Sequence, residues 1–285
     1  MDAADPKYVL PQYKTDQGLK ARIETHKRYG IGSSGGFDGM TQMLAERVAP
    51  QTILDLGAGT GNWYRSIRQV LGPKVYYVGL DQSPGMVERL MEMTTQDSNA
   101  EIRQGDAQSL DFGDNRFDWV GAHYMLYHVP DIGRAVKEAW RVLKPGGLLA
   151  AATNAKKPYQ ELWDIGEQVA RELGLEGDSP GHWMRFHLDN GDTFFPKGAE
   201  VVRWDSGFRF RKAEPAVDYM ASGPISIHLG SQAGRPDLVK RALNLFGQHV
   251  DAIIEDSGVF EVHSQSGVPP TKRGFTTLEM GNYGN

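Results

Sequence analysis

The middle of the chain alternates short apolar runs with segments of helical spacing, and this alternation limits the folds that it can adopt. The expected strands are residues 52–56, 75–80, 101–104, 117–122 and 148–153. Between the last two strands, Ile132, Ala135, Val136 and Ala139 recur at the three- and four-residue spacing of a helix face. Strands that alternate with helices form a parallel sheet covered on both faces. The sequence therefore predicts an α/β three-layer sandwich.

The flanking segments predict further elements. Residues 16–29 and 37–49 read as two helices joined by a glycine-rich stretch that we expect to be a flexible joint. A helix is expected at 159–173, where apolar residues keep helical spacing. The remaining expected elements are strands at 199–210, 258–265 and 274–280 and helices at 213–222 and 236–255.

Composition excludes several classes of protein. The chain has 285 residues and no cysteine, which excludes disulfide scaffolds, thiol nucleophiles and cysteine-ligated metals. A formal net charge of −5 argues against a broadly basic nucleic-acid binder. The first residues are polar and acidic, unlike a signal peptide, and no apolar run approaches the roughly 18 residues of a membrane span. We expect a cytoplasmic protein that does not enter membranes, and its oligomeric state stays open.

The segment 55–63 reads DLGAGTGNW and joins an expected strand to an expected helix. Glycine lets a backbone approach a ligand closely because no Cβ intervenes. A dinucleotide site would show G-x-G-x-x-G, but here the third glycine comes one residue early and Asn62 takes the expected glycine position. The carboxylate of Asp55 would repel a phosphate and suit an ammonium group. The segment therefore predicts a zwitterionic nucleoside ligand.

Two further acids end neighbouring strands. Asp81 lies 24 residues after Gly57, where an acid can accept both hydroxyls of a ribose. Asp106 lies 25 residues after Asp81, at the end of the third expected strand, where it could meet an adenine amino group. One such acid can be a turn or cap residue. Acids at successive strand ends favour a nucleoside site at the carboxyl edge of the sheet.

Four segments together resemble the class I S-adenosylmethionine-dependent methyltransferases, most closely the small-molecule branch with a ubiquinone-biosynthesis-like motif pattern. They read ILDLGAGTG at 53–61, GLD at 79–81, GDA at 105–107 and RVLKPGG at 141–147. The resemblance implies a Rossmann-like, mostly parallel seven-stranded sheet with an antiparallel last strand. It also implies S-adenosylmethionine as cofactor and methyl transfer to oxygen, nitrogen or carbon of a small-molecule acceptor by in-line displacement.

The same resemblance implies a set of cofactor-binding residues. The glycines would line the methionine and ribose moieties, Asp81 would hold the ribose, and Asp106 the adenine. The whole set is Tyr13, Arg22, Asp55, Gly57, Ala58, Gly59, Gly61, Asp81, Gln82, Met86, Asp106, Ala107, Gln108, Ala122 and His123. Met86 could equally be helix core. Tyr13 and Arg22 would close over the cofactor, or would belong to a solvated amphipathic helix.

The family pattern also implies a domain organisation. Residues 1–36 would form a helical N-terminal lid, and 37–285 the Rossmann-like methyltransferase domain with its cofactor half at 50–153. Because a glycine-rich joint precedes the helix at Phe37, we expect residues 1–36 to order when cofactor binds. An insertion between the fifth and sixth strands, about 154–198, would face the substrate. Its aromatic and histidine side chains could line an acceptor pocket or form the core of a lid: Tyr159, Trp163, His182, Trp183, Phe186, His187, Phe194 and Phe195.

Two histidines after the fourth strand are candidates for catalysis. His123 and His128 could act as a general base if the acceptor begins as a protonated oxygen or nitrogen. His128 could instead have a structural or hydrogen-bonding role. No carboxylate stands at metal-ligand spacing from either histidine, so we expect no metal site.

Other functions remain open at this stage. An enzyme of this kind could cyclise or eliminate the cofactor's own aminobutyrate chain and release methylthioadenosine. A cofactor-binding interaction module without turnover is a further alternative. RNA methylation is disfavoured by the charge, although aromatic and basic residues alternate at 204–212. That alternation is also typical of a strand with one solvent face, which we favour.

Overall fold

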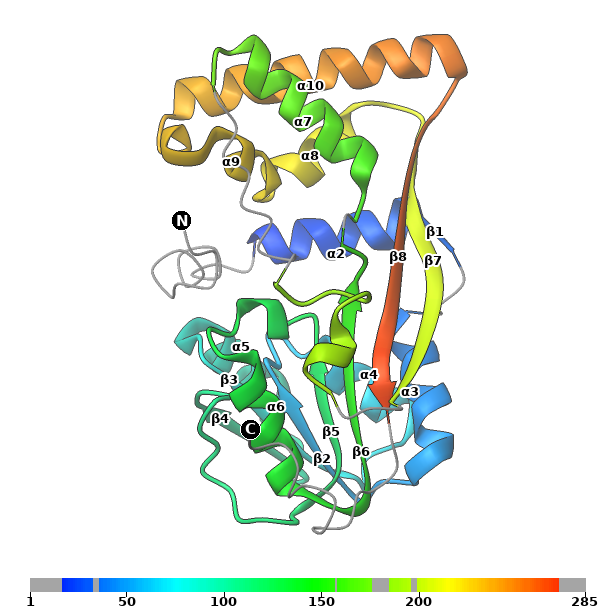
Figure 1. Ribbon diagram of the computed structural model, residues 1–285, viewed down its shortest axis with the longest axis vertical. Coiled ribbons are helices and arrows are strands. Elements are labelled where there is room, and N and C mark those ends of the chain that lie inside the picture. The colour runs from blue at the N-terminus through cyan, green and yellow to red at the C-terminus, as the bar shows by residue number, and fades with distance from the viewer. Residues whose placement is uncertain (1–16, 33–35, 157, 176–184, 196–198, 272–285) are drawn as a thin grey trace. The chain divides into compact units, whose positions relative to one another are not determined.

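The computed structural model describes residues 17–32, 36–156, 158–175, 185–195 and 199–271 (Figure 1). The chain forms two compact units, each built from three separate parts of the sequence. Unit 1 comprises Met1–Ser33, Lys157–His182 and Asp205–Gln265. Unit 2 comprises Ser34–Lys156, Trp183–Trp204 and Ser266–Asn285.

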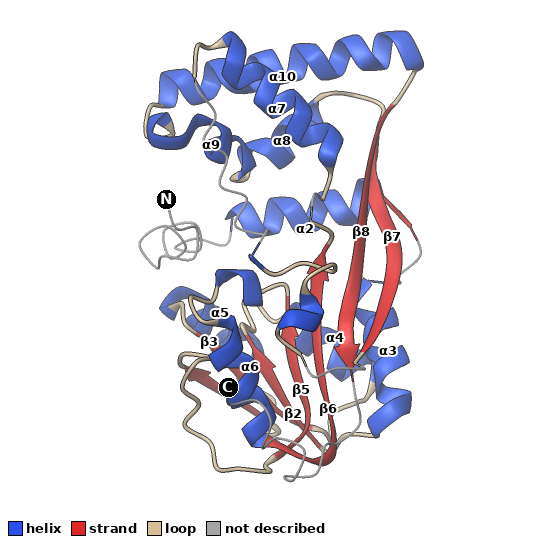
Figure 2. Cartoon of the chain, viewed as in Figure 1, coloured by secondary structure: helices blue, strands red, loops and turns tan. Residues whose placement is uncertain are grey.

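Unit 2 contains the predicted parallel sheet (red in Figure 2). Its strands are β2 (Thr52–Leu56), β3 (Tyr76–Asp81), β4 (Ala100–Gln104), β5 (Phe117–His123) and β6 (Leu143–Asn154). They run parallel in the order β6-β5-β2-β3-β4. The connecting helices are α4 (Asn62–Val70), α5 (Pro84–Thr94) and α6 (Ile132–Val142), and α3 (Gly36–Val48) precedes β2. The expected Rossmann-like α/β architecture is confirmed.

Both faces of this sheet are buried. On one face, α6 packs on Leu54 and Val120 in a core that also contains Phe186. On the other face, α3, α4 and α5 cover Ile53 and Trp119. Because β2 and β5 are buried on both faces, they read as nearly continuous apolar runs, as parallel strands do.

The strand count differs from the expected seven. The described residues form an eight-stranded sheet in the order β1-β7-β8-β6-β5-β2-β3-β4. The additional strands are β1 (Gly30–Gly32), β7 (Glu200–Phe210) and β8 (Phe260–Thr271), and β8 pairs antiparallel with β6. The last expected strand, at 274–280, lies outside the described residues.

The extra strand β1 arises where we expected only a flexible joint. It pairs antiparallel with β7, with Ile31 opposite Gly207. A Cβ on Gly32 would lie 2.2 Å from the carbonyl oxygen of Asp205. The missing side chain therefore permits the close backbone approach that makes this pairing possible.

Unit 1 is largely helical. Its helices are α2 (Gln17–Tyr29), α7 (Gln160–Glu172), α8 (Glu214–Ala221), α9 (Pro224–Leu229) and α10 (Pro236–Ser257), and the short 3₁₀ turn η4 spans Gly230–Gln232. In α10, Leu238, Ala242, Phe246 and Val250 are buried at a constant spacing of four residues, as an amphipathic helix requires. None of the helices in the described part of the chain is long and apolar enough to cross a membrane.

Candidate functional site

The loop Gly57–Gly61 turns the chain from β2 into α4. Gly57, Gly59 and Gly61 have φ angles of 67°, 54° and 79°, in the left-handed region that favours glycine. The backbone N–H groups of Gly57 and Ala58 both donate to the carbonyl oxygen of Leu80, at 2.8 and 3.0 Å. These hydrogen bonds fix the loop against the end of β3.

The three glycines differ in what surrounds them. A Cβ on Gly57 would lie 2.6 Å from Cβ of Met125, and one on Gly61 would lie 2.6 Å from Cδ1 of Leu90. The nearest atom to a Cβ on Gly59 would be 3.9 Å away. Packing within the protein therefore demands glycine at 57 and 61, whereas Gly59 presents its backbone to open space that a ligand can enter.

Asp81 links this loop to the end of β3. Its Oδ2 accepts the backbone N–H of Gly59 at 2.8 Å, and its Oδ1 accepts that of Ser83 at 2.8 Å. Burial raises the pKa of Asp81, and the hydrogen bonds from Ser83 and Gly59 oppose that rise. Each carboxylate oxygen can accept a further hydrogen bond. Gln82, the residue after β3, is exposed, and Met86 on α5 is buried.

Asp55 is buried beneath the loop. Its Oδ2 accepts a hydrogen bond of 2.8 Å from the Tyr77 hydroxyl. Burial raises the pKa of Asp55 to about 8, the hydrogen bond from Tyr77 opposes this, and the charge of Asp81 adds to it. Near pH 7 the carboxyl group is then mostly neutral. A neutral carboxyl attracts an ammonium group less strongly than the carboxylate that the sequence suggested.

Two glycines on the neighbouring strands flank Asp55. Gly79 on β3 and Gly121 on β5 are its partners in register. A Cβ on Gly121 would lie 2.2 Å from the ring of Trp63, and one on Gly79 would lie 3.0 Å from the hydroxyl of Tyr77. These glycines make room for two aromatic side chains over the sheet, which sequence reasoning missed.

His123 ends β5 on the same face of the sheet. Its ring lies 4.3 Å from that of Trp63 at 90° and 6.1 Å from that of Phe37. The side chain is buried, and neither ring nitrogen has a hydrogen-bond partner within the described residues. Burial lowers the pKa of His123 to about 3. The imidazole is therefore neutral near pH 7 and a weak proton acceptor.

After β5 the backbone takes an unusual conformation. Tyr124 has a φ of 57°, which bulky residues rarely adopt outside constrained sites. Its N–H donates to the carbonyl oxygen of Ala152 at 2.8 Å. The short 3₁₀ turn η1 (Leu126–His128) follows, and the half-buried His128 lies 4.6 Å from the ring of Tyr127.

Asp106 lies in the loop after β4 and is exposed. The side-chain amide of Gln108 donates to both of its carboxylate oxygens at 3.0 Å. The amide oxygen of Gln108 accepts the N–H of Asp131, which caps α6, at 2.9 Å. Gln108 thus connects Asp106 to the start of α6, while Ala107 between them is buried.

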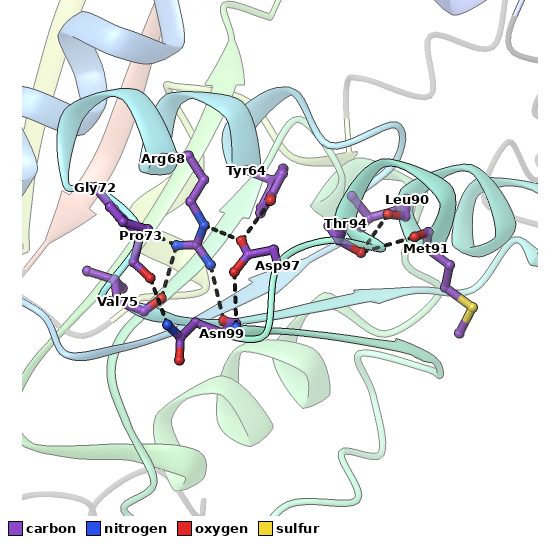
Figure 3. A network of polar contacts seen from close by, with 10 residues as sticks. All are labelled: Tyr64, Arg68, Gly72, Pro73, Val75, Leu90, Met91, Thr94, Asp97 and Asn99. Atoms are coloured by element: carbon purple, nitrogen blue, oxygen red, sulfur yellow. Dashed lines mark hydrogen bonds and ion pairs between the residues drawn. The ribbon is translucent and has the colours of Figure 1, made fainter.

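A polar network anchors α4, the helix that follows the loop (Figure 3). Arg68 on α4 donates to Asp97 at 2.5 Å and to the carbonyl oxygens of Val75 and Asn99 at 2.9 and 3.1 Å. Tyr64 also donates to Asp97, at 2.7 Å. These bonds anchor α4 to the segments that lead into β3 and β4, so the helix that begins at the glycine loop is held in place.

The described part of the insertion covers the end of β6. The Thr153 hydroxyl donates to the carbonyl oxygen of Phe186 at 3.1 Å, and the Leu188 N–H donates to that of Asn154 at 3.0 Å. Arg185 donates to the carbonyl oxygens of Val129 and Pro130 at 3.2 and 2.6 Å. Residues 185–195 include the 3₁₀ turn η3 (Gly191–Thr193).

The insertion's aromatic residues are divided between several places. Phe186 and Phe195 are buried in unit 2, and Phe194 packs beside them. His187 is also buried there, where burial lowers its pKa. Tyr159 and Trp163 belong to unit 1. His182 and Trp183 lie outside the described residues.

Two of the predicted cofactor residues come from the N-terminal part of the chain. Tyr13 lies outside the described residues. Arg22 lies on α2 in unit 1, where its Nη1 donates to the carbonyl oxygen of Ser222 at 2.9 Å. Of the residues that the structure describes, no three or more histidines and acids are grouped so that they could hold a metal ion.

Comparison with known proteins identifies the family. The family model described as a methyltransferase domain matches residues 54–151, which run from within β2 through the glycine loop into β6. A demethylmenaquinone methyltransferase of Staphylococcus aureus (strain Newman) is 42% identical over 186 residues, covering 62% of this chain and 74% of the relative. That of Staphylococcus carnosus (strain TM300) is 33% identical over 184 residues, with the same coverage.

A solved structure agrees at the level of the fold. The YcgJ protein of Bacillus subtilis has a TM-score of 0.55 and 20% sequence identity, and the match covers 85% of this chain and all of that one. With the two relatives and the matched methyltransferase domain, the chain belongs to the class I S-adenosylmethionine-dependent methyltransferases and is an enzyme that uses this cofactor as its methyl donor.

Proposed function

We propose that the enzyme methylates a small-molecule acceptor by in-line displacement, with the cofactor bound across the carboxyl ends of β2, β3 and β5. The observation that carries this proposal is Gly59, whose backbone borders open space while its N–H is held by Asp81. A nucleoside with an amino-acid chain fits a site that combines open space beside the Gly59 backbone with the carboxylate of Asp81.

The residues around the loop suit the parts of S-adenosylmethionine. Asp81 has acceptor capacity for two ribose hydroxyls, and Asp106 with Gln108 offers acceptors and a donor for the edge of an adenine. The orphaned imidazole nitrogens of His123 offer a hydrogen bond to a buried ligand group. The proposed cofactor residues in unit 2 are Asp55, Gly57, Ala58, Gly59, Gly61, Asp81, Gln82, Met86, Asp106, Ala107, Gln108, Ala122 and His123.

The protein's own contribution is placement and exclusion of water. When bound, the cofactor supplies a methyl group on a positively charged sulfur, whose charge disappears on transfer. The buried Trp63 and the adjoining Phe37 and His123 make the end of β5 apolar. An apolar, preformed site favours loss of charge and holds two reactants in line.

For the acceptor, we propose a ring-containing molecule that is quinone-like in shape. The relatives are named for demethylmenaquinone, and the proposal rests on that name, since Phe186 and Phe195 of the described insertion are buried in the core. His123 would orient the acceptor or cofactor as a neutral hydrogen-bond partner, and His128 stays a candidate for contact with the acceptor.

The wider organisation is also part of the proposal. Residues 1–36 would act as a lid, residues 37–285 as the methyltransferase domain with its cofactor half at 50–153, and the insertion at about 154–198 would select the acceptor. We further propose a cytoplasmic location, since the sequence has no apolar run of membrane-spanning length.

Calorimetry with S-adenosylhomocysteine tests the cofactor site. We expect low-micromolar binding, about −8 kcal/mol, and at least tenfold weaker binding by Asp81→Asn. Asp111→Asn is the matched control, since Asp111 is exposed and lies outside the proposed site. Absence of binding by folded wild-type protein would overturn the assignment.

The product nucleoside tests the reaction. With a short-chain reduced naphthoquinone as acceptor, we expect S-adenosylhomocysteine and a methylated quinol in equal amounts. Release of methylthioadenosine would instead indicate an enzyme that cleaves the cofactor's aminobutyrate chain. Binding without any product would indicate either a different acceptor or a binding module, and a panel of phenols and amines separates those two cases.

A further inference from the structure

The loop 107–116 connects β4 to β5 in unit 2 and belongs to no named helix or strand. Backbone N–H and C=O groups in such a loop need hydrogen-bond partners elsewhere. Three side chains of α6 supply them. These residues are four and three positions apart, so they share one face of the helix. We call them the α6 clamp: Arg134, Glu138 and Arg141.

Arg141 uses its whole guanidinium in the clamp. Its Nε and Nη2 donate to the two carboxylate oxygens of Glu138 at 2.8 and 2.9 Å. Nη2 also donates to the carbonyl oxygen of Leu110 at 2.9 Å, and Nη1 donates to that of Phe112 at 2.7 Å and to the carboxylate of Asp114 at 2.8 Å. All five N–H donors are therefore used. A lysine has three donors and no planar fork, so it cannot make the same set of bonds.

Glu138 and Arg134 hold the same loop. Oε2 of Glu138 accepts the N–H of Leu110 at 2.9 Å, so the clamp binds both backbone groups of Leu110. The hydrogen bonds from Arg141 hold the pKa of Glu138 below its usual range, so it is a carboxylate near pH 7. Nε of Arg134 donates to the carbonyl oxygen of Gln108 at 2.8 Å. The clamp therefore extends along the loop as far as Gln108.

The partners of the Gln108 side chain fix the orientation of its amide. The amide oxygen accepts the backbone N–H of Asp131, which can only donate, at 2.9 Å. The amide nitrogen lies 3.0 Å from both oxygens of the Asp106 carboxylate, which can only accept. One N–H pointing between the two oxygens makes both contacts, because the two N–H bonds of an amide diverge too widely to reach one carboxylate together. The second N–H then has no partner within the described residues.

Asp106 keeps one acceptor position beside that donor. Its Oδ1 accepts the backbone N–H of Gln108 at 2.8 Å in addition to the amide. Its Oδ2 accepts only the amide within the described residues, and a carboxylate oxygen can accept two hydrogen bonds. An acceptor beside a donor matches adenine, whose edge presents an amino group beside a ring nitrogen. Hypoxanthine has a carbonyl oxygen in place of that amino group, and this oxygen would face the carboxylate.

We propose that the α6 clamp determines which nucleobase the cofactor site accepts, by holding Gln108 and Asp106 in one donor–acceptor order. Without Arg134, the Gln108 carbonyl loses a charged hydrogen-bond partner and the loop that carries the amide is held less firmly. Arg134 and Arg141 act through the loop and are positioning residues. This inference rests on the proposed methyltransferase function with its adenosine-containing cofactor, and it adds the residues that select the base.

Packing offers a simpler account of the clamp. Leu110 and Phe112 belong to the buried core that also contains Ala135 and Ala139 of α6. A clamp that served only this packing would stabilise the fold and leave the choice of base unchanged. The ratio of the affinities for two nucleosides separates the two accounts, because both ligands bind the same folded protein.

Calorimetry with S-adenosylhomocysteine and S-inosylhomocysteine measures this ratio. The second compound has a carbonyl oxygen where adenine has its amino group. We expect wild type to bind the adenine compound roughly tenfold more tightly or better, because a mismatched base leaves polar groups unpaired. Arg134→Gln and Arg141→Lys should each reduce the ratio at least threefold. Lys137→Gln, which removes an exposed cation from the same helix, should leave it unchanged.

The outcomes keep this inference separate from the proposed function. An unchanged ratio in Arg134→Gln would overturn the inference, whatever the melting temperature of the variant. Arg134 is exposed, so this variant decides the question even if Arg141→Lys does not fold. Equal binding of both nucleosides by wild type would also overturn it and would leave the cofactor site in place. If wild type binds neither nucleoside, the proposed function fails and this inference fails with it.

Discussion

At the scale of single residues, His123 combines two properties that packing alone does not explain. Its ring is buried among aromatic side chains, yet neither nitrogen has a partner within the described residues. A buried polar group without a partner costs roughly 1–3 kcal/mol. We therefore expect the imidazole nitrogens of His123 to bind a ligand, because a phenyl ring would fill the same space without the unsatisfied polar atoms.

The variant His123→Phe separates packing from function. We expect its free energy of unfolding to be the same as that of wild type or up to about 1 kcal/mol higher, because the unsatisfied nitrogens are removed. We also expect its turnover to fall at least tenfold. Urea denaturation and an assay of S-adenosylhomocysteine release measure the two quantities. Unchanged turnover would show that the imidazole nitrogens have no role in the reaction.

Asp55 should make stability depend on pH in an unusual direction. Its pKa is about 8 in the folded protein and near 3.8 when unfolded. Between these values the unfolded chain releases a proton that the folded protein retains, so this group lowers stability as pH rises from about 4 to 8. Asp55→Asn lacks that titration. The free energy of unfolding of Asp55→Asn minus that of wild type should therefore be larger at pH 9 than at pH 5. Urea denaturation of both proteins at the two pH values measures this difference.

At the scale of elements, the face of the sheet that carries Asp55 and His123 depends on glycines in its strands. Gly121→Ala would place a methyl group 2.2 Å from the ring of Trp63. Overpacking of this kind costs about 1–3 kcal/mol. Because Trp63 also contacts His123, we expect weaker binding of S-adenosylhomocysteine as well. Gly113→Ala is the control, since nothing lies within 4 Å of its Cβ, and equal melting temperatures for the two variants would contradict this account.

Elements with strong local signals were predictable. The structure has β2 at the predicted residues Thr52–Leu56 and begins α4 at the predicted Asn62. The helix α9 (Pro224–Leu229) was not predicted, because six residues after a glycine are too short for a periodic pattern. Strand β1 was missed for another reason. It exists through pairing with β7, which lies far away in the sequence.

The residues of the candidate site likewise divide into those with a local sequence signal and those placed by contacts distant in sequence. The glycine loop and its acids were visible in the sequence, since close backbone approach and carboxylates at strand ends have local signatures. Trp63 and Tyr77 were not, because their positions depend on which residues of neighbouring strands lie in register. The sequence did contain one usable signal, because Gly79 and Gly121 are glycines within strands. A glycine at such a position often marks a place where another group packs closely against the backbone.

At the scale of the whole molecule, the chain first passes from unit 1 to unit 2 at Ser33–Ser34. The glycine-rich stretch 30–36 follows α2, contains β1 and crosses this boundary, and residues 1–36 are the proposed lid. The lid proposal therefore predicts a change in residues 1–36 when cofactor binds.

Limited digestion with proteinase K, read by mass spectrometry, measures that change. We expect saturating S-adenosylhomocysteine to slow cleavage within residues 1–36 at least fivefold, because ordered backbone must open before a protease can cut it. Methylthioadenosine tests whether the amino-acid chain of the ligand is needed for this protection. Cleavage between Ser257 and Phe260, after α10, serves as the internal reference. Equal slowing there would indicate general stabilisation by ligand, and unchanged cleavage within 1–36 would mean that this segment is no cofactor-dependent lid.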